Sequence, residues 1–134
     1  MYWAEDRVGK HRIKGAYAYK NLLENHGKVA LGTDFPVEQV NPFLTFYAAT
    51  IRKDIEGYPE EGFQMKDALS REETLKGMTF WAAYSNFEEE EKGSIEVGKF
   101  ADFVILNQDI MKVEGEEIPK TKAISTFVNG EKVY

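Results

Sequence analysis

The stretch Val29-Ala30-Leu31-Gly32-Thr33-Asp34 decides the fold. It is a short apolar run without alternation, and it ends in polar turn residues. Such a run is typical of a strand buried on both faces, as in a parallel sheet. A helical stripe over residues 15–26 comes before it, and Gly27 stands where a helix uses a left-handed cap. The order of helix, glycine and buried strand predicts an α/β protein.

Two further helices are predicted after this strand. Asn41-Pro42 combines an N-cap residue with proline at the first helical position, and apolar residues at helical spacing continue to Ile51. Ser70-Arg71-Glu72-Glu73 is a capping box that opens a helix running to about residue 87. Residues 57–69 between them are turn-rich and predict a surface loop. Residues 3–14 are charged without a clear period, which predicts a loop or a frayed helix.

The last third of the chain changes from helical to strand patterning. The charge run over residues 88–92 indicates a solvated boundary, and strand-like runs follow at residues 94–97, 102–106 and 123–128. Asn129-Gly130 then predicts a hairpin to residues 131–134, because both turn residues tolerate positive φ. The sequence therefore predicts an α/β part over residues 1–91 and an antiparallel β part over residues 92–134.

Composition excludes several classes of function for these 134 residues. The formal net charge of −6 argues against nucleic acid as a partner, because phosphate binding needs a positive patch. No apolar run approaches the roughly 18 residues of a membrane span, so no membrane partner is expected. With no cysteine and two histidines, the chain alone cannot supply a thiolate nucleophile or a histidine-built metal site.

Asp34 is the candidate catalytic or metal-binding residue. It comes directly after the predicted buried strand, and ligands and catalytic groups gather at the carboxyl ends of such strands. A carboxylate there can act as a general base or a metal ligand. The alternative is an aspartate that only forms a turn. His11 and His26 have neither the helical nor the strand spacing of a ligand pair, which indicates structural or surface roles.

Several segments resemble, in this order, family 3 amidohydrolases. Residues 3–9, residues 15–18 and the run Gly32-Thr33-Asp34-Phe35-Pro36-Val37-Glu38 carry the first part of the resemblance. Residues 92–106 resemble the segment by which many amidohydrolases leave the barrel and enter a small β-sandwich domain. Residues 128–134 resemble the last hairpin of such proteins, so the resemblance covers essentially the whole chain.

The resemblance implies the C-terminal part of a metal-dependent hydrolase with a (β/α)₈ TIM barrel. A whole barrel takes about 250 residues, so we expect Met1 to be an internal residue of a longer chain. Residues 1–91 would be the C-terminal end of the barrel, with residues 29–33 as its last strand, and residues 92–134 would be β-sandwich strands. Asp34 matches the aspartate that in relatives approaches the metal, takes a proton from the attacking water and passes it to the leaving group.

The resemblance also implies a substrate and a cofactor for the parent protein. The substrate would be a small molecule with a non-peptide, amide-like C–N bond, and the cofactor a divalent metal, with zinc expected. The family's other metal ligands are absent from this chain, and zinc needs about three protein ligands. We therefore expect the isolated fragment to be inactive and to bind no metal tightly.

Two expectations concern the state of the chain. Uncovered apolar faces and an unpaired strand edge predict a homo-oligomer or a disordered N-terminal third. The start of the sequence lacks a signal peptide, but Met1 is expected to be internal, so the location stays unknown, with cytoplasmic as the default. The alternative function is a non-catalytic regulatory or interaction protein that keeps the amidohydrolase fold, since some family members have been labelled regulators of exoenzyme production.

Overall fold

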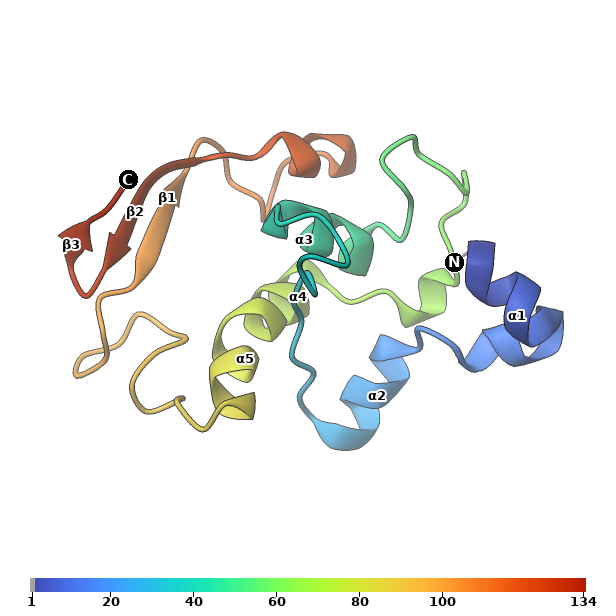
Figure 1. Ribbon diagram of the computed structural model, residues 1–134, viewed down its shortest axis with the longest axis horizontal. Coiled ribbons are helices and arrows are strands. Elements are labelled where there is room, and N and C mark those ends of the chain that lie inside the picture. Colours follow the sequence, from blue (N-terminus) through green and yellow to red (C-terminus); the bar gives the residue numbers. More distant parts are fainter. Residues whose placement is uncertain (1) are drawn as a thin grey trace.

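The structure, a computed structural model, describes residues 2–134. Five α-helices and three strands follow one another in the order α1 (Tyr2–Arg12), α2 (Tyr19–His26), α3 (Pro42–Thr50), α4 (Arg71–Met78), α5 (Phe80–Ser85), β1 (Phe103–Leu106), β2 (Ala123–Val128) and β3 (Glu131–Lys132). Short 3₁₀ helices add η1 (Ile13–Gly15), η2 (Met65–Asp67) and η3 (Gly115–Lys120). Figure 1 shows the sheet at one end of the molecule and α1 at the other. Within this described part, no helix is long and apolar enough to cross a membrane.

The predicted helix caps are confirmed. The Asn41 side chain accepts a hydrogen bond from the Phe43 N–H at 3.0 Å. Ser70 and Glu73 make both bonds of the capping box, at 3.2 and 2.8 Å. Gly27 ends α2 in the left-handed region, with φ of 85°. These caps join groups at most four residues apart, so the local sequence is sufficient to predict them.

Two predicted helices differ from the structure in their bounds. The second helix begins at Tyr19 instead of near Gly15, because Tyr17 lies in the left-handed region with φ of 57°. The helix predicted over residues 70–87 is divided at Thr79, whose φ and ψ of −127° and −91° are not helical. Residues 2–12 form a helix that is interrupted at Gly9 (φ 76°, ψ 162°), in line with the prediction of a frayed helix.

The buried strand predicted over Val29 to Thr33 does not form. The segment runs instead beside α4, where the Leu31 N–H donates to the Gly77 carbonyl at 3.0 Å. A Cβ on Gly77 would come within 2.9 Å of both the Leu31 side chain and the Val29 carbonyl, so α4 and this segment are in close contact at Gly77. A parallel strand needs hydrogen-bonded neighbours on both sides. The sheet within residues 2–134 contains no such neighbours, and the run therefore stays unpaired and only partly buried.

The β part consists of one antiparallel sheet in the order β1-β2-β3. The Asn129-Gly130 hairpin is confirmed, with φ of 50° and 81° at its two turn residues. The strand predicted over residues 94–97 is wrong: the segment is irregular, and Ile95 and Val97 are exposed. An isolated apolar alternation of this length has no packing partner among the described residues and so gains little from extension.

Helix α3 lies at the centre of the packing (Figure 1). Its Phe46 and Tyr47 form one buried cluster with residues of the 107–120 connection, Ile110 and Ile118. On the other side, Ala49 packs with Leu23 of α2 and Leu69. The helix therefore joins the N-terminal segments to the β part.

Candidate functional site

Asp34 is exposed and begins the turn that follows the unpaired run. Its backbone is left-handed, with φ of 55°, and its carbonyl accepts a hydrogen bond from the Val37 N–H at 2.8 Å. The Phe35 N–H donates to the Thr33 hydroxyl at 3.3 Å. Aspartate and asparagine occupy this region more readily than other side chains, so the turn alone accounts for the residue type. Among the described residues, none donates a hydrogen bond to the Asp34 carboxylate, which remains free to meet a ligand.

The residues of this chain do not by themselves fit a metal centre. His11 lies in α1 and His26 ends α2, and both are exposed. In the part of the chain that the structure describes, no three histidine, cysteine, aspartate or glutamate side chains are close enough together to hold a metal ion. Because a zinc ion takes about three protein ligands, Asp34 could contribute only one ligand to a site completed by other residues.

A groove of about 710 Å³ opens beside the Asp34 turn. Thr33 and Glu38, on the two sides of the turn, both line it. The remaining wall comes from α3, from the segment after it and from aromatic residues, chiefly Tyr17, Tyr19, Leu44, Tyr47, Arg52 and Phe63. Its volume is within the range of about 300–1,000 Å³ that small-molecule pockets occupy. The groove is therefore large enough for a small organic molecule, and two neighbours of Asp34 in the chain line it, although Asp34 itself does not.

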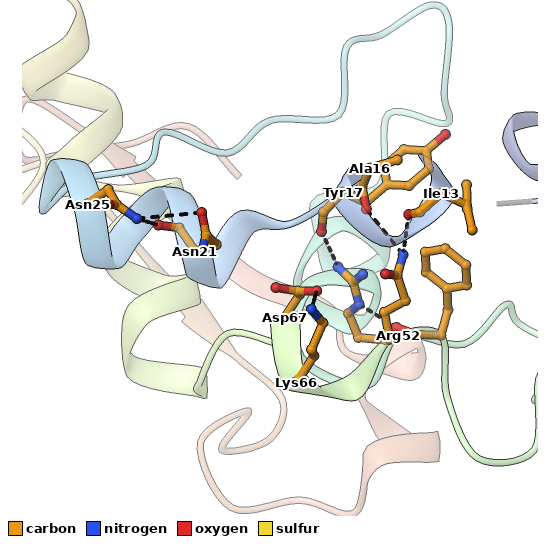
Figure 2. Close-up of polar contacts among 10 residues, drawn as sticks. Ile13, Ala16, Tyr17, Asn21, Asn25, Arg52, Lys66 and Asp67 are labelled. Carbon is orange, nitrogen blue, oxygen red and sulfur yellow. Dashed lines mark hydrogen bonds and ion pairs between the residues drawn. The ribbon is translucent and has the colours of Figure 1, made fainter. Parts of the chain in front are cut away.

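Arg52 is a buried charged residue among those that line the groove, and Figure 2 shows its polar contacts. The residue is only 7% exposed, and its Nε donates to the Phe63 carbonyl at 2.7 Å. Its Nη1 donates to the Tyr17 carbonyl at 3.0 Å. Burial lowers the pKa of the guanidinium, and the nearby charge of Asp67 partly opposes that shift. Arg52 thus ties together three segments that are distant in sequence.

Gln64 reinforces the same junction. Its side-chain amide donates to the carbonyls of Ile13 and Ala16, at 2.9 and 3.2 Å. Tyr17, Arg52 and Gln64 all have left-handed backbone, with φ of 57°, 59° and 46°. Residues in this region cost free energy, so the surrounding contacts must hold them there. We call Arg52, Gln64 and Tyr17 the Arg52 junction.

Three buried polar atoms at or near the junction have no hydrogen-bond partner among the residues that the structure describes: Arg52 Nη2, Gln64 Oε1 and Asp67 Oδ2. The Asp67 atom lies 3.8 Å from Lys66 Nζ, an ion pair beyond hydrogen-bond distance. The sequence analysis missed this junction. Its residues share no sequence motif. Tyrosine, arginine and glutamine also have no preference for a positive φ, so the left-handed backbone at these positions could not be predicted.

The comparisons with known proteins bear on the whole chain. Residues 1–134 match the model of the amidohydrolase family. The chain is 31% identical over 132 residues to the Bacillus subtilis (strain 168) protein named "Putative amidohydrolase YtcJ", a match that covers 98% of this chain and 25% of that protein. It is 29% identical over 129 residues to "Protein LONG AFTER FAR-RED 3" of Arabidopsis thaliana, covering 96% of this chain and 22% of that protein.

A further relative is "N-substituted formamide deformylase" of Arthrobacter pascens, 26% identical over 114 residues, which are 85% of this chain and 20% of that protein. No solved structure matches. The chain spans a quarter or less of the length of these relatives. Because the family model matches every residue from 1 to 134, the chain belongs to the amidohydrolase family.

Proposed function

We propose that this chain is the C-terminal part of a hydrolase that cleaves carbon–nitrogen bonds in small, non-peptide, amide-like substrates. The match to the amidohydrolase family over the full chain carries this proposal. The printed name of one relative, N-substituted formamide deformylase, supports a C–N bond as the bond broken. The groove beside Asp34 has room for such a substrate.

In this proposal Asp34 is the carboxylate that moves the proton. It accepts a proton from the water that attacks the carbonyl carbon and delivers it to the nitrogen that leaves. The C–O bond forms, the C–N bond breaks, and the carboxylate ends unprotonated as it began. An exposed carboxylate on a turn, without a hydrogen-bond donor among the described residues, is able to approach both atoms.

The proposed parent has a (β/α)₈ barrel that ends within residues 1–91 and a β-sandwich to which residues 92–134 contribute. The unpaired run at residues 29–33 supports this division, because its apolar composition suits a strand with neighbours on both sides. A divalent metal in the parent, with zinc expected, would need most of its ligands from outside this chain, and we derive no step through it.

The substitution Asp34→Asn, made in the proposed full-length parent protein, tests the role of the carboxylate. Asparagine has the same shape and occupies the left-handed region equally well, so folding should not change. We expect formate release from an N-substituted formamide to fall by about 10²- to 10⁴-fold, the usual worth of general acid–base catalysis. Activity within about threefold of the unsubstituted enzyme would contradict the assignment.

Calorimetric titration of the 134-residue chain with zinc tests the fragment proposal separately. We expect no stoichiometric, submicromolar binding, because a single carboxylate is too few ligands. Tight binding that Asp34→Asn abolishes would show that this chain makes its own metal centre, and the fragment proposal would then be abandoned.

The second candidate is a non-catalytic regulatory or interaction protein with the same fold. One relative of similar identity, LONG AFTER FAR-RED 3, has a printed name that states no reaction. The coding region upstream of Met1 distinguishes the two candidates. Barrel strands with histidine ligands there favour the hydrolase, and a barrel that lacks them favours the regulator.

A further inference from the structure

The Asn129-Gly130 turn combines a reactive dipeptide with hydrogen bonds that hold its backbone. Among the asparagines of the chain, only Asn129 is followed by glycine. Asparagine is one of the thermolabile residues, because the backbone nitrogen of the next residue can attack its side-chain amide carbon. Glycine in the next position has no side chain to hinder this approach. Asn129 and Gly130 are both exposed between β2 and β3, so water has access to them.

The residues just before β1 bind both backbone N–H groups of this turn. The Asn129 N–H donates to the Asp102 carboxylate at 2.7 Å. The Gly130 N–H donates to the Ala101 carbonyl at 3.0 Å. We call these two hydrogen bonds the turn clamp. The Gly130 nitrogen is the atom that would attack the Asn129 side chain, so the turn clamp occupies its N–H while the turn is closed.

We propose that Asn129 is a site of spontaneous deamidation and that the turn clamp sets the rate of this reaction. The Gly130 nitrogen loses its proton and bonds to the side-chain carbon Cγ of Asn129. The bond from Cγ to the amide nitrogen breaks, ammonia leaves, and a five-membered succinimide ring remains. Water then opens one of the two bonds between the ring nitrogen and a carbonyl carbon, which yields aspartate or isoaspartate. One water is consumed and one ammonia is released, so the reaction needs no oxidant, reductant or cofactor.

The turn clamp opposes the first step in two ways. The peptide bond between the two residues must rotate to bring the Gly130 nitrogen toward the Asn129 side chain, and this rotation breaks the hydrogen bond to the Ala101 carbonyl. The hydrogen bond to Asp102 also holds Asn129 in its left-handed conformation, with φ of 50°. Opening of the turn must therefore come before the chemistry, and the observed rate is the intrinsic rate multiplied by the open fraction.

The product would close into the same turn less readily. Aspartate at position 129 places a second carboxylate beside that of Asp102, and like charges so close together repel. Isoaspartate adds one carbon atom to the backbone, which shifts β3 relative to its partners in β2. The modification therefore marks chains whose hairpin has opened. This inference rests on the turn alone and does not depend on the proposed reaction.

A tryptic peptide reports the reaction in the full 134-residue chain. Cleavage after Lys122 and Lys132 releases residues 123–132 with the turn inside them. The chain and a synthetic peptide of residues 123–132 are incubated side by side at neutral pH, and mass spectrometry measures the fraction in which the amide has become an acid. We expect the chain to deamidate about tenfold more slowly than the peptide, or slower still. Equal rates, or a peptide that stays unchanged, would overturn the proposal.

The substitution Asp102→Ala tests the turn clamp itself. It removes the acceptor of the Asn129 N–H, and the loss of a hydrogen bond to a charged group should raise the rate in the chain about tenfold. Asp109→Ala is the matched control, because the Asp109 carboxylate also accepts a backbone N–H, that of Met111 at 2.9 Å, but lies outside the hairpin. We expect the control to deamidate at the rate of the unsubstituted chain.

Far-UV circular dichroism checks that each variant folds. Asp102→Asn keeps an acceptor oxygen without the charge, so its rate should lie between those of Asp102→Ala and the unsubstituted chain, and it decides the test if Asp102→Ala does not fold. A folded Asp102→Ala chain that deamidates no faster than the Asp109→Ala control would overturn the proposal.

Discussion

Arg52→Ala should be among the most destabilising single substitutions in this chain. It removes the hydrogen bonds from Nε to the Phe63 carbonyl and from Nη1 to the Tyr17 carbonyl. The segments that carry these carbonyls are also joined by the hydrogen bonds of Gln64 to Ile13 and Ala16. The substitution therefore leaves two acceptors without their donor and weakens the attachment of the segment around Tyr17 to the loop around Phe63.

The magnitude follows from the number and kind of bonds lost. Hydrogen bonds to a charged group contribute about 1.5–3 kcal/mol each, so two of them give about 3–6 kcal/mol. The guanidinium is itself desolvated and its Nη2 has no partner, which opposes folding and is relieved by the substitution. We therefore expect the lower end of the range, a loss of about 3 kcal/mol in the free energy of unfolding.

Urea unfolding followed by far-UV circular dichroism measures this loss. Arg12→Ala is the matched control: its Nε also donates to a carbonyl, that of Val8 at 2.9 Å, but the residue is exposed and the bond is local. We expect the control to change the free energy of unfolding by about 0.5 kcal/mol or less. Arg52→Lys should lie between the two, because an ammonium lacks the planar fork that reaches both carbonyls.

Arg52→Gly separates hydrogen bonding from backbone strain. The residue lies at φ of 59°, which costs a residue with a Cβ about 1–2 kcal/mol but costs glycine nothing. Glycine should therefore be less destabilising than alanine by about 1 kcal/mol, the reverse of the order found in an ordinary extended or helical segment. If Arg52→Ala unfolds like the Arg12→Ala control, or if glycine is the worse substitution, the reasoning about the junction fails.

Three other substitutions test the local structure by the same unfolding assay. Gly77→Ala should destabilise by about 1–3 kcal/mol, because its Cβ would meet Leu31 and the Val29 carbonyl, whereas Gly15→Ala, with no atom within 4 Å, should be close to neutral. Ser70→Ala should lower the free energy of unfolding by about 1 kcal/mol, and an unchanged value would show that the capping box does not stabilise the protein. Hydrogen bonds from Lys20, and to a smaller extent from Ser70, lower the pKa of Glu73 in the folded protein. The ionised Glu73 therefore stabilises the fold fully above its unfolded-state pKa of about 4.3, and this stabilisation is lost as the pH falls through its folded-state pKa. Glu73→Gln should therefore flatten the acid side of the stability profile, and an unchanged slope would contradict this.

Prediction from the sequence succeeded where the deciding contacts are short in range. The caps at Asn41 and Ser70 and the Asn129-Gly130 turn each depend on residues within four positions of one another. The residue types at these positions are sufficient to predict them, because the capping side chain or the freedom to adopt positive φ is supplied locally. Asp34 was singled out from its place after an apolar run, and its catalytic role stays a prediction.

Prediction failed where the outcome depends on a distant partner. Residues 29–33 have the composition of a buried strand, but a strand forms only beside another one. The run at residues 94–97 failed for the same reason. The Arg52 junction brings together positions up to 51 residues apart, and no local pattern indicates that Arg52, Gln64 and Tyr17 meet.

The sequence by itself thus indicated the family, the helix starts at Asn41 and Ser70, the hairpin and the candidate carboxylate. Only the tertiary structure decided that the run before Asp34 lies unpaired against α4, that Arg52 is buried beside the groove, and that β1 pairs with β2 alone among the described elements. The physical reason is the range of the interactions. Caps and turns satisfy backbone groups within a few residues, whereas strand pairing and the burial of a charge depend on which distant segments are present to complete them.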